Sequence, residues 1–163
     1  MTVDIPAEIE PYLRAVSDPE IPVLSILDMG IVREVKQDGQ QLLVKITPTY
    51  SGCPAMDMIG AEIKQALDQA GYHTTVEQVL SPAWTTDWLT EEGRRKLEEY
   101  GIAAPLDESA DKLALMGQSR LVHCPKCNSQ NTKMVSQFGS TACKALFQCQ
   151  DCLEPFDYFK CLK

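Results

Sequence analysis

The sequence predicts an α+β protein: a small mixed N-terminal domain followed by a C-terminal zinc ribbon of short antiparallel strands. In the first part, strand-like alternation of apolar residues gives way to a helix-like apolar stripe and then to a further strand pattern. In the last 40 residues, two C-x2-C pairs supply four thiols at a spacing typical of a zinc site. Residues 1–118 carry nine Lys/Arg and twenty Asp/Glu, whereas residues 119–163 carry six and three. An acidic part therefore precedes a mildly basic one.

We expect the two domains to span residues 1–103 and 119–163. Residues 104–118 lack a clear core pattern and hold Pro105 among several acidic residues, which favours a linker with no more than a turn or two of helix. A ribbon of about 45 residues buries too little surface to fold easily without help. A structural metal would supply the missing free energy of folding.

The N-terminal elements follow from local signals along the chain. We expect a short helix over residues 5–16, strands over 31–36, 42–47 and 74–80, and a helix that is capped by Asp87 or Thr90 and ends near residue 100. A tight turn over residues 37–39 joins the first two strands into a hairpin. Trp84 and Trp88 are interpreted as core anchors, because nothing basic lies near them in the sequence.

Cys53 lies at the junction between a predicted strand and a predicted helix over residues 54–70. Pro54 suits the first helical position, where its missing N–H costs nothing. The unpaired N–H groups and the positive end of the helix dipole favour a thiolate at such a position. The same place also suits a small buried residue that closes the loop. Position alone leaves both interpretations open.

The C-terminal cysteines form two pairs separated by 21 residues: Cys124, Cys127, Cys149 and Cys152. Two residues between cysteines let one tight turn deliver both thiolates to a tetrahedral ion, so we expect structural zinc. An iron–sulfur cluster is also compatible with four thiolates of this region. Asn128 and Leu153 follow the two pairs where glycine is usual, and asparagine tolerates the left-handed conformation. Cys143 and Cys161 are two further thiols, interpreted as buried fillers, a redox pair or substitutes for a ligand.

Composition argues against several classes of function. The net charge of −8 disfavours general nucleic-acid binding. No segment approaches the roughly 20 apolar residues that span a bilayer, and the N-terminus has no signal-peptide pattern. We therefore expect a cytoplasmic protein whose seven cysteines serve metal or redox chemistry. No Gly-rich phosphate loop or Ser/His/Asp arrangement indicates an enzyme, and a thiol enzyme using Cys53 would need a base that the sequence does not identify.

Three motifs resemble the MIP18-like (DUF59) family of iron–sulfur assembly proteins: DPEIP at residues 18–22, LDMGIV at 27–32 and TPTYSGCPA at 47–55. Further motifs, at residues 84–88, 100–102, 138–146 and 154–161, are similar to those of the family of D subunits of bacterial ring-1,2-phenylacetyl-CoA epoxidase systems. Together the two resemblances cover almost the whole chain.

The resemblance implies a non-catalytic, auxiliary protein that helps to assemble or deliver an iron–sulfur cluster. The implied client is the iron–sulfur reductase of the epoxidase system, with the other subunits as partners. The resemblance makes Cys53 the cysteine of the family and Asp18 and Glu20 its acidic pair. One cysteine cannot supply the usual four ligands, so a transient cluster would need a homodimer or the client to complete its ligand set.

Other interpretations of these residues stay open. Asp18 could instead close a turn and Glu20 could be solvated. Thr47, Thr49 and Ser51 could donate hydrogen bonds to a cluster sulfide or a phosphate, or bind the backbone of their own loop. The alternative function is a docking module that binds a partner subunit through its ribbon. In that case three aromatic residues would be interface anchors rather than ribbon core: Phe156, Tyr158 and Phe159.

Overall fold

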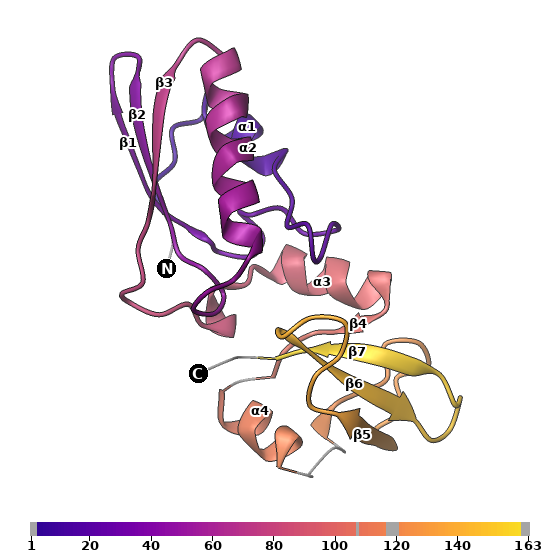
Figure 1. The fold of residues 1–163 in the computed structure, drawn as a ribbon. Helices are drawn as coiled ribbons and strands as arrows, with labels where there is room; N and C mark the ends of the chain where they lie inside the picture. Colours follow the sequence, from indigo (N-terminus) through magenta and orange to yellow (C-terminus); the bar gives the residue numbers. More distant parts are fainter. Residues whose placement is uncertain (1–2, 107, 117–120, 161–163) are drawn as a thin grey trace. The chain divides into compact units, whose positions relative to one another are not determined.

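The computed structural model describes residues 3–106, 108–116 and 121–160 (Figure 1). The chain separates into two compact units, Met1–Gly93 and Arg94–Lys163, each with its own sheet. The predicted α+β class is confirmed. Within the described ranges, no helix is both long enough and apolar enough to cross a bilayer.

The first unit is built on a three-stranded sheet in the order β1-β2-β3. Its strands are β1 (Val32–Asp38), β2 (Gln41–Ile46) and β3 (His73–Gln78). β1 and β2 are antiparallel and form the predicted hairpin, and β2 and β3 are parallel. A parallel pair needs a long crossover, which here is helix α2 (Ala55–Gln69), drawn beside β3 in Figure 1.

In the first unit, apolar residues determine which side of α2 is buried, and a proline determines where α1 begins. One side of α2 is buried through Ala55, Met56, Ile59, Ile63 and Leu67, which is the predicted stripe. Helix α1 is shorter than predicted and spans only Glu10–Arg14. Pro11 occupies its first turn, and a proline there is compatible with a helix start but not with a helix interior. The helix therefore begins at Glu10 rather than at residue 5.

The end of the first unit holds a short 3₁₀ helix, η1 (Thr86–Trp88), and the start of α3 (Glu91–Tyr100). Thr90 Oγ1 accepts a hydrogen bond from the Gly93 N–H at 2.9 Å, so Thr90, not Asp87, caps α3. Trp84 is buried and its Nε1 donates to the Met29 carbonyl at 2.8 Å, which confirms it as a core anchor. Trp88 is only half-buried.

The second unit holds a four-stranded sheet in the order β4-β7-β6-β5. Its strands are β4 (Ile102–Ala103), β5 (Thr132–Ser136), β6 (Lys144–Cys149) and β7 (Pro155–Phe159). The pairs β5–β6 and β6–β7 are antiparallel, as expected for the ribbon. β4 adds a short parallel pairing with β7. Phe156 and Tyr158 are 4% and 0% exposed and belong to the apolar cluster of this unit, so their interpretation as exposed interface anchors is wrong. Phe159 is also 0% exposed.

The predicted linker also packs in this unit. Residues 104–118 include helix α4 (Glu108–Leu115), and Ala114 lies fully buried in one apolar cluster with Phe147. The buried Asp111 carboxylate accepts a hydrogen bond from the Tyr158 hydroxyl. The observed division of the chain after Gly93 thus differs from the predicted domain bounds at 103 and 119. No local pattern indicates this packing, because both contacts join residues far apart in the chain.

Candidate metal centre and loop cysteine

The four paired cysteines of the second unit converge at one point. The Sγ atoms of Cys124, Cys127, Cys149 and Cys152 all lie within 4.8 Å of one another. The Sγ–Sγ distance is 3.7 Å for Cys124–Cys152 and 3.5 Å for Cys127–Cys149. A tetrahedral zinc ion with Zn–S bonds of about 2.3 Å separates its sulfurs by roughly 3.8 Å. The donor set therefore fits a tetrahedral metal ion bound by four thiolates.

The backbone of each C-x2-C turn is shaped for this convergence. Asn128 and Leu153 adopt left-handed conformations, with φ of 60° and 65°. The predicted conformation of Asn128 is thus confirmed, and Leu153 adopts the same one without the tolerance that asparagine has. The pKa of Cys149 is lowered to about 7, first by the backbone N–H of Cys152. Cys149 is therefore favoured as a thiolate. The pKa of Cys152 is instead raised to about 12, because burial and the neighbouring cysteines outweigh the backbone hydrogen bond of Glu154.

Asp151, which no motif in the sequence singles out, joins the two C-x2-C turns. Its carboxylate accepts hydrogen bonds from Ser129 Oγ and from Asn131 Nδ2, the latter at 3.0 Å. These two bonds lower the pKa of Asp151. Ser129 also accepts the Asn131 N–H at 3.0 Å. The available signal was an acidic residue inside one turn and short polar residues just after the other.

One of the two further thiols, that of Cys143, is separate from this cluster. Cys143 is buried, and its Sγ lies 3.1 Å from Thr141 Oγ1. It does not belong to the four-cysteine group, which supports the interpretation of a buried filler over that of a ligand. Cys161 lies outside the described residues.

Cys53 precedes the first residue of α2 by two positions and is 8% exposed. Burial raises the pKa of its thiol, and the negative charges of Glu20 and Asp18 raise it further. Hydrogen bonds from the Ala55 backbone and from Tyr50 act in the opposite direction but do not prevail. Loss of hydration therefore outweighs the hydrogen bonds that favour a thiolate. Of the two interpretations left open for this position, the burial supports the small residue that closes the loop.

The structure brings Asp18 and Glu20 within electrostatic reach of Cys53. Asp18 is buried, and its Oδ1 accepts the backbone N–H groups of Glu20 at 2.7 Å and Ile21 at 3.1 Å. Asp18 thus closes the local turn, while Glu20 is half-buried. The three residues that the sequence grouped by resemblance lie in one region of the first unit.

The loop hydroxyls differ in their surroundings. Thr47 is 1% exposed, and its Oγ1 has no hydrogen-bond partner within the part of the chain that the structure describes. Thr49 is buried and Ser51 is exposed. The simpler interpretation, in which each hydroxyl binds its own loop, therefore does not apply to Thr47.

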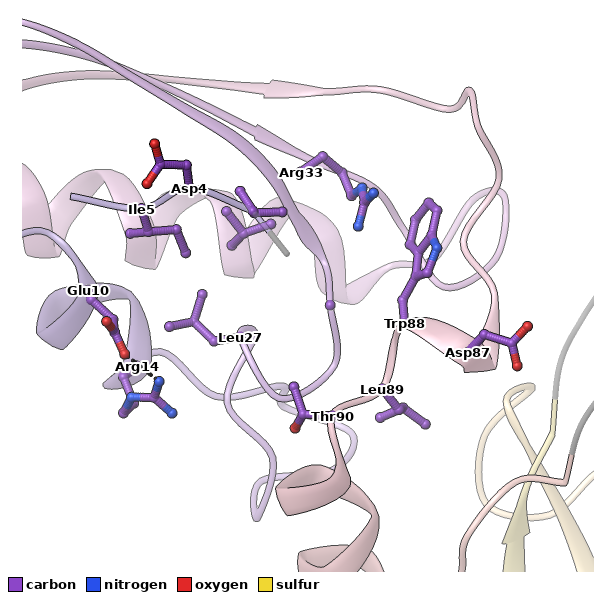
Figure 2. Close-up of a pocket in the computed structure, with 13 residues that line it drawn as sticks. Asp4, Ile5, Glu10, Arg14, Leu27, Arg33, Asp87, Trp88, Leu89 and Thr90 are labelled. Atoms are coloured by element: carbon purple, nitrogen blue, oxygen red, sulfur yellow. Dashed lines mark hydrogen bonds and ion pairs between the residues drawn. The ribbon is translucent and has the colours of Figure 1, made fainter. Parts of the chain in front are cut away.

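The first unit also contains a cavity of about 640 Å³ (Figure 2). The Arg33 guanidinium lies over the Trp88 ring at 3.6 Å from its centroid, and burial lowers the pKa of Arg33. Gly30 lets the backbone close here, because an added Cβ would lie 2.4 Å from the Trp88 carbonyl oxygen. The cavity is lined by Val3, Asp4, Ile5, Glu10, Arg14, Leu27, Gly30, Val32, Arg33, Asp87, Trp88, Leu89 and Thr90. None of the predicted site residues belongs to this lining.

Two family models match the chain in the same order as its two sheets. The model described as "Iron-sulfur cluster assembly protein" matches residues 6–80, and the "PaaD zinc beta ribbon domain" matches residues 108–160. The second match includes α4 as well as the ribbon strands. It begins eleven residues before the predicted start of the ribbon.

Similar proteins extend both matches. The chain is 49% identical over 157 residues to the D subunit of the putative 1,2-phenylacetyl-CoA epoxidase of Escherichia coli K12, covering 95% of this chain and 92% of that protein. It is 37% identical over 81 residues to the Fe-S protein maturation auxiliary factor YitW of Bacillus subtilis, covering 48% and 78%. Among solved structures, a DUF59 domain from Bacillus anthracis superposes with a TM-score of 0.52 at 26% identity, covering 55% of this chain and 88% of that one.

Proposed function

The chain belongs to the family of 1,2-phenylacetyl-CoA epoxidase D subunits, and on that premise we propose that it helps to assemble or deliver the iron–sulfur cluster of the reductase component. It is an auxiliary, non-catalytic protein of phenylacetate catabolism in this proposal. The maturation factors that resemble part of the chain support a role in cluster handling.

The observation that carries the proposal is the buried Cys53 thiol with Asp18 and Glu20 near it. A metal ion must displace the proton of a thiol, so a raised pKa weakens metal binding at neutral pH. One thiolate also leaves most of the cluster ligands to another chain. Weak and incomplete ligation suits a protein that must release a cluster to its client.

The role of the ribbon follows from its four thiolates. We propose that Cys124, Cys127, Cys149 and Cys152 hold structural zinc. When bound, zinc would tie the two C-x2-C turns together and supply folding free energy to a small unit. The four residues bind and orient the ion, while Cys53 in the first unit handles the cluster.

The proposal is tested by anaerobic purification followed by measurement of zinc, iron and acid-labile sulfide. Three proteins are compared: the natural chain, Cys53→Ala and Cys143→Ala. We expect zinc near one per chain in all three, and iron with sulfide only where Cys53 is present. Each is then incubated with cluster-free reductase, whose recovery of electron transfer should fail only with Cys53→Ala.

Other results would point elsewhere. Full reductase recovery with Cys53→Ala would favour a docking module in which the ribbon binds a partner subunit without any cluster chemistry. Iron and sulfide without zinc in all three proteins would show that the four-cysteine site holds the cluster. Light scattering before and after cluster loading would show whether a second copy or the client completes the ligand set. The cytoplasm, as the location of this exchange, remains a prediction from the sequence.

A further inference from the structure

A groove of about 500 Å³ runs between helix α2 and strand β3 in the first unit. β3 is an edge strand of its sheet. The groove has an apolar floor that includes Ile46, Met56 and Val76, and the small residues Gly60 and Ala61 of α2 keep it open. A Cβ added to Gly60 would meet only Val76 Cγ1, at 3.7 Å, so glycine is not required there for packing.

On the outer edge of β3, the backbone N–H and C=O groups have hydrogen-bond partners at one end of the strand only. The His73 and Val79 N–H groups bond to the Gln40 and Ile46 carbonyls, so the N–H and C=O groups of the even-numbered residues between them point away from β2. At Thr74 both groups are covered by α2, since its N–H donates to Asp68 and its carbonyl accepts from Lys64, each at 2.9 Å. Val76 and Gln78 follow, and their outward backbone groups meet no partner among the described residues.

The groove also contains an unused polar side chain. Thr74 is 4% exposed and lines the groove, and its Oγ1 makes no hydrogen bond of normal geometry in the described part of the chain. It lies near enough to the Asp68 carboxylate to help lower the pKa of that group. A buried hydroxyl without a partner is unfavourable. A bound chain that offers a backbone or side-chain hydrogen bond would satisfy it.

Charge identifies the kind of occupant. The first unit has fifteen Asp/Glu against five Lys/Arg. On the groove, Lys64 is already paired with Asp68 at 2.7 Å, which leaves the carboxylate of Asp57 as the available charge. Glu77 lies on the opposite face of β3, because side chains alternate along a strand. A second acidic copy of this unit would be repelled, whereas a basic segment would be attracted.

We propose that a basic, extended segment of a partner protein adds as a fourth strand to the free edge of β3 at Val76 and Gln78. Backbone hydrogen bonds hold the segment, and its alternate small apolar side chains enter the groove beside Gly60. The site ends at the first turn of α2, next to the loop that carries Cys53. The proposal does not depend on any cluster chemistry at that cysteine.

The test uses the full chain with zinc bound and an acetylated, amidated heptapeptide of alternating lysine and valine. We expect saturable binding, with hydrogen exchange slowed about tenfold or more at the amides of Val76 and Gln78 but not at Thr75. Two N-methylated peptides, one methylated at its lysines and one at its valines, serve as controls. Only one should lose binding, because a strand presents alternate N–H groups to its neighbour.

Two variants locate the site. Gly60→Met should fill the groove and weaken binding about tenfold or more, whereas Gln65→Met, on the same helix but outside the groove, should leave it unchanged. If Gly60→Met does not fold, Gln78→Pro removes an outward N–H without disturbing the pairing with β2. The proposal is overturned by absence of saturable binding, by equal binding of both methylated peptides, or by light scattering that shows a second copy on this edge.

Discussion

Asp151 Oδ1 lies 3.0 Å from Asn131 Nδ2, so a side chain within the second C-x2-C turn is bonded to the segment that follows the first. The Gln150 N–H donates to the Asn131 carbonyl at 2.8 Å and reinforces the same link. The two turns are therefore held in register by hydrogen bonds within the chain, in addition to the thiolates. These bonds lower the entropy cost of bringing the four sulfurs together when a metal ion binds.

Asp151→Ala should weaken zinc binding, because the turns would no longer be held together before the ion binds. We expect a loss of affinity of about 10- to 100-fold, the range for groups that orient metal ligands. Competition with a chromophoric chelator measures it. Lys133→Gln is the control, since Lys133 is an exposed residue of β5 and belongs to neither turn. Equal affinities in the two variants would show that Asp151 has no orienting role.

Leu153→Gly should raise zinc affinity. Leu153 has φ of 65°, and a left-handed conformation costs a side-chain-bearing residue about 1–2 kcal/mol that glycine avoids. Because metal binding is linked to folding, relief of about 1 kcal/mol corresponds to roughly fivefold tighter binding. The same chelator competition applies. Asn128→Gly should raise zinc affinity less, since asparagine tolerates φ of 60°. An equal or larger increase in zinc affinity in that variant would contradict the explanation.

The reactivity of Cys53 should depend on pH with a midpoint above that of an ordinary thiol, because burial and the charge of Glu20 raise its pKa. Removing a negative charge stabilises the thiolate, so Glu20→Gln should move the midpoint to lower pH. Alkylation by iodoacetamide, quantified on the tryptic peptide of residues 46–64, measures it. Glu62→Gln, an exposed change on α2, should leave the midpoint unchanged. A shift to higher pH in Glu20→Gln would refute the electrostatic account.

Gly30→Ala should destabilise the first unit more than Gly39→Ala. Both glycines have positive φ, 69° and 58°, which costs alanine about 1–2 kcal/mol. Only at Gly30 would the new Cβ also lie 2.4 Å from the Trp88 carbonyl oxygen, whereas nothing lies within 4 Å of it at Gly39. Urea unfolding followed by tryptophan fluorescence reports on this unit, which contains both tryptophans. An equal loss of unfolding free energy in the two variants would mean that the backbone near Trp88 moves to accommodate the new Cβ at little cost.

Local patterns carried most of what the sequence predicted. The hairpin, α2 and the four-cysteine cluster each depend on residues within a short stretch or on a fixed spacing, so periodicity and C-x2-C pairs suffice to find them. β4 was missed, and so was the packing of α4, although a turn or two of helix was expected there. Both depend on distant partners in β7. The two interpretations of Cys53 stayed open for a related reason. A helix N-terminus is visible in sequence, but the burial that opposes it is not.

The hydrogen bond between Asp111 and Tyr158 bears on where this protein can be divided. Tyr158 is the largest of the fully buried side chains in the described part of the chain, and its hydroxyl also accepts the Leu106 N–H at 3.2 Å. A C-terminal fragment that begins at residue 119 would keep all four metal-binding thiols yet leave that hydroxyl without either partner. It would also uncover the apolar cluster around Phe147. A fragment intended for spectroscopy or crystallisation should therefore start at or before β4, even though every cysteine of the ribbon lies well beyond it.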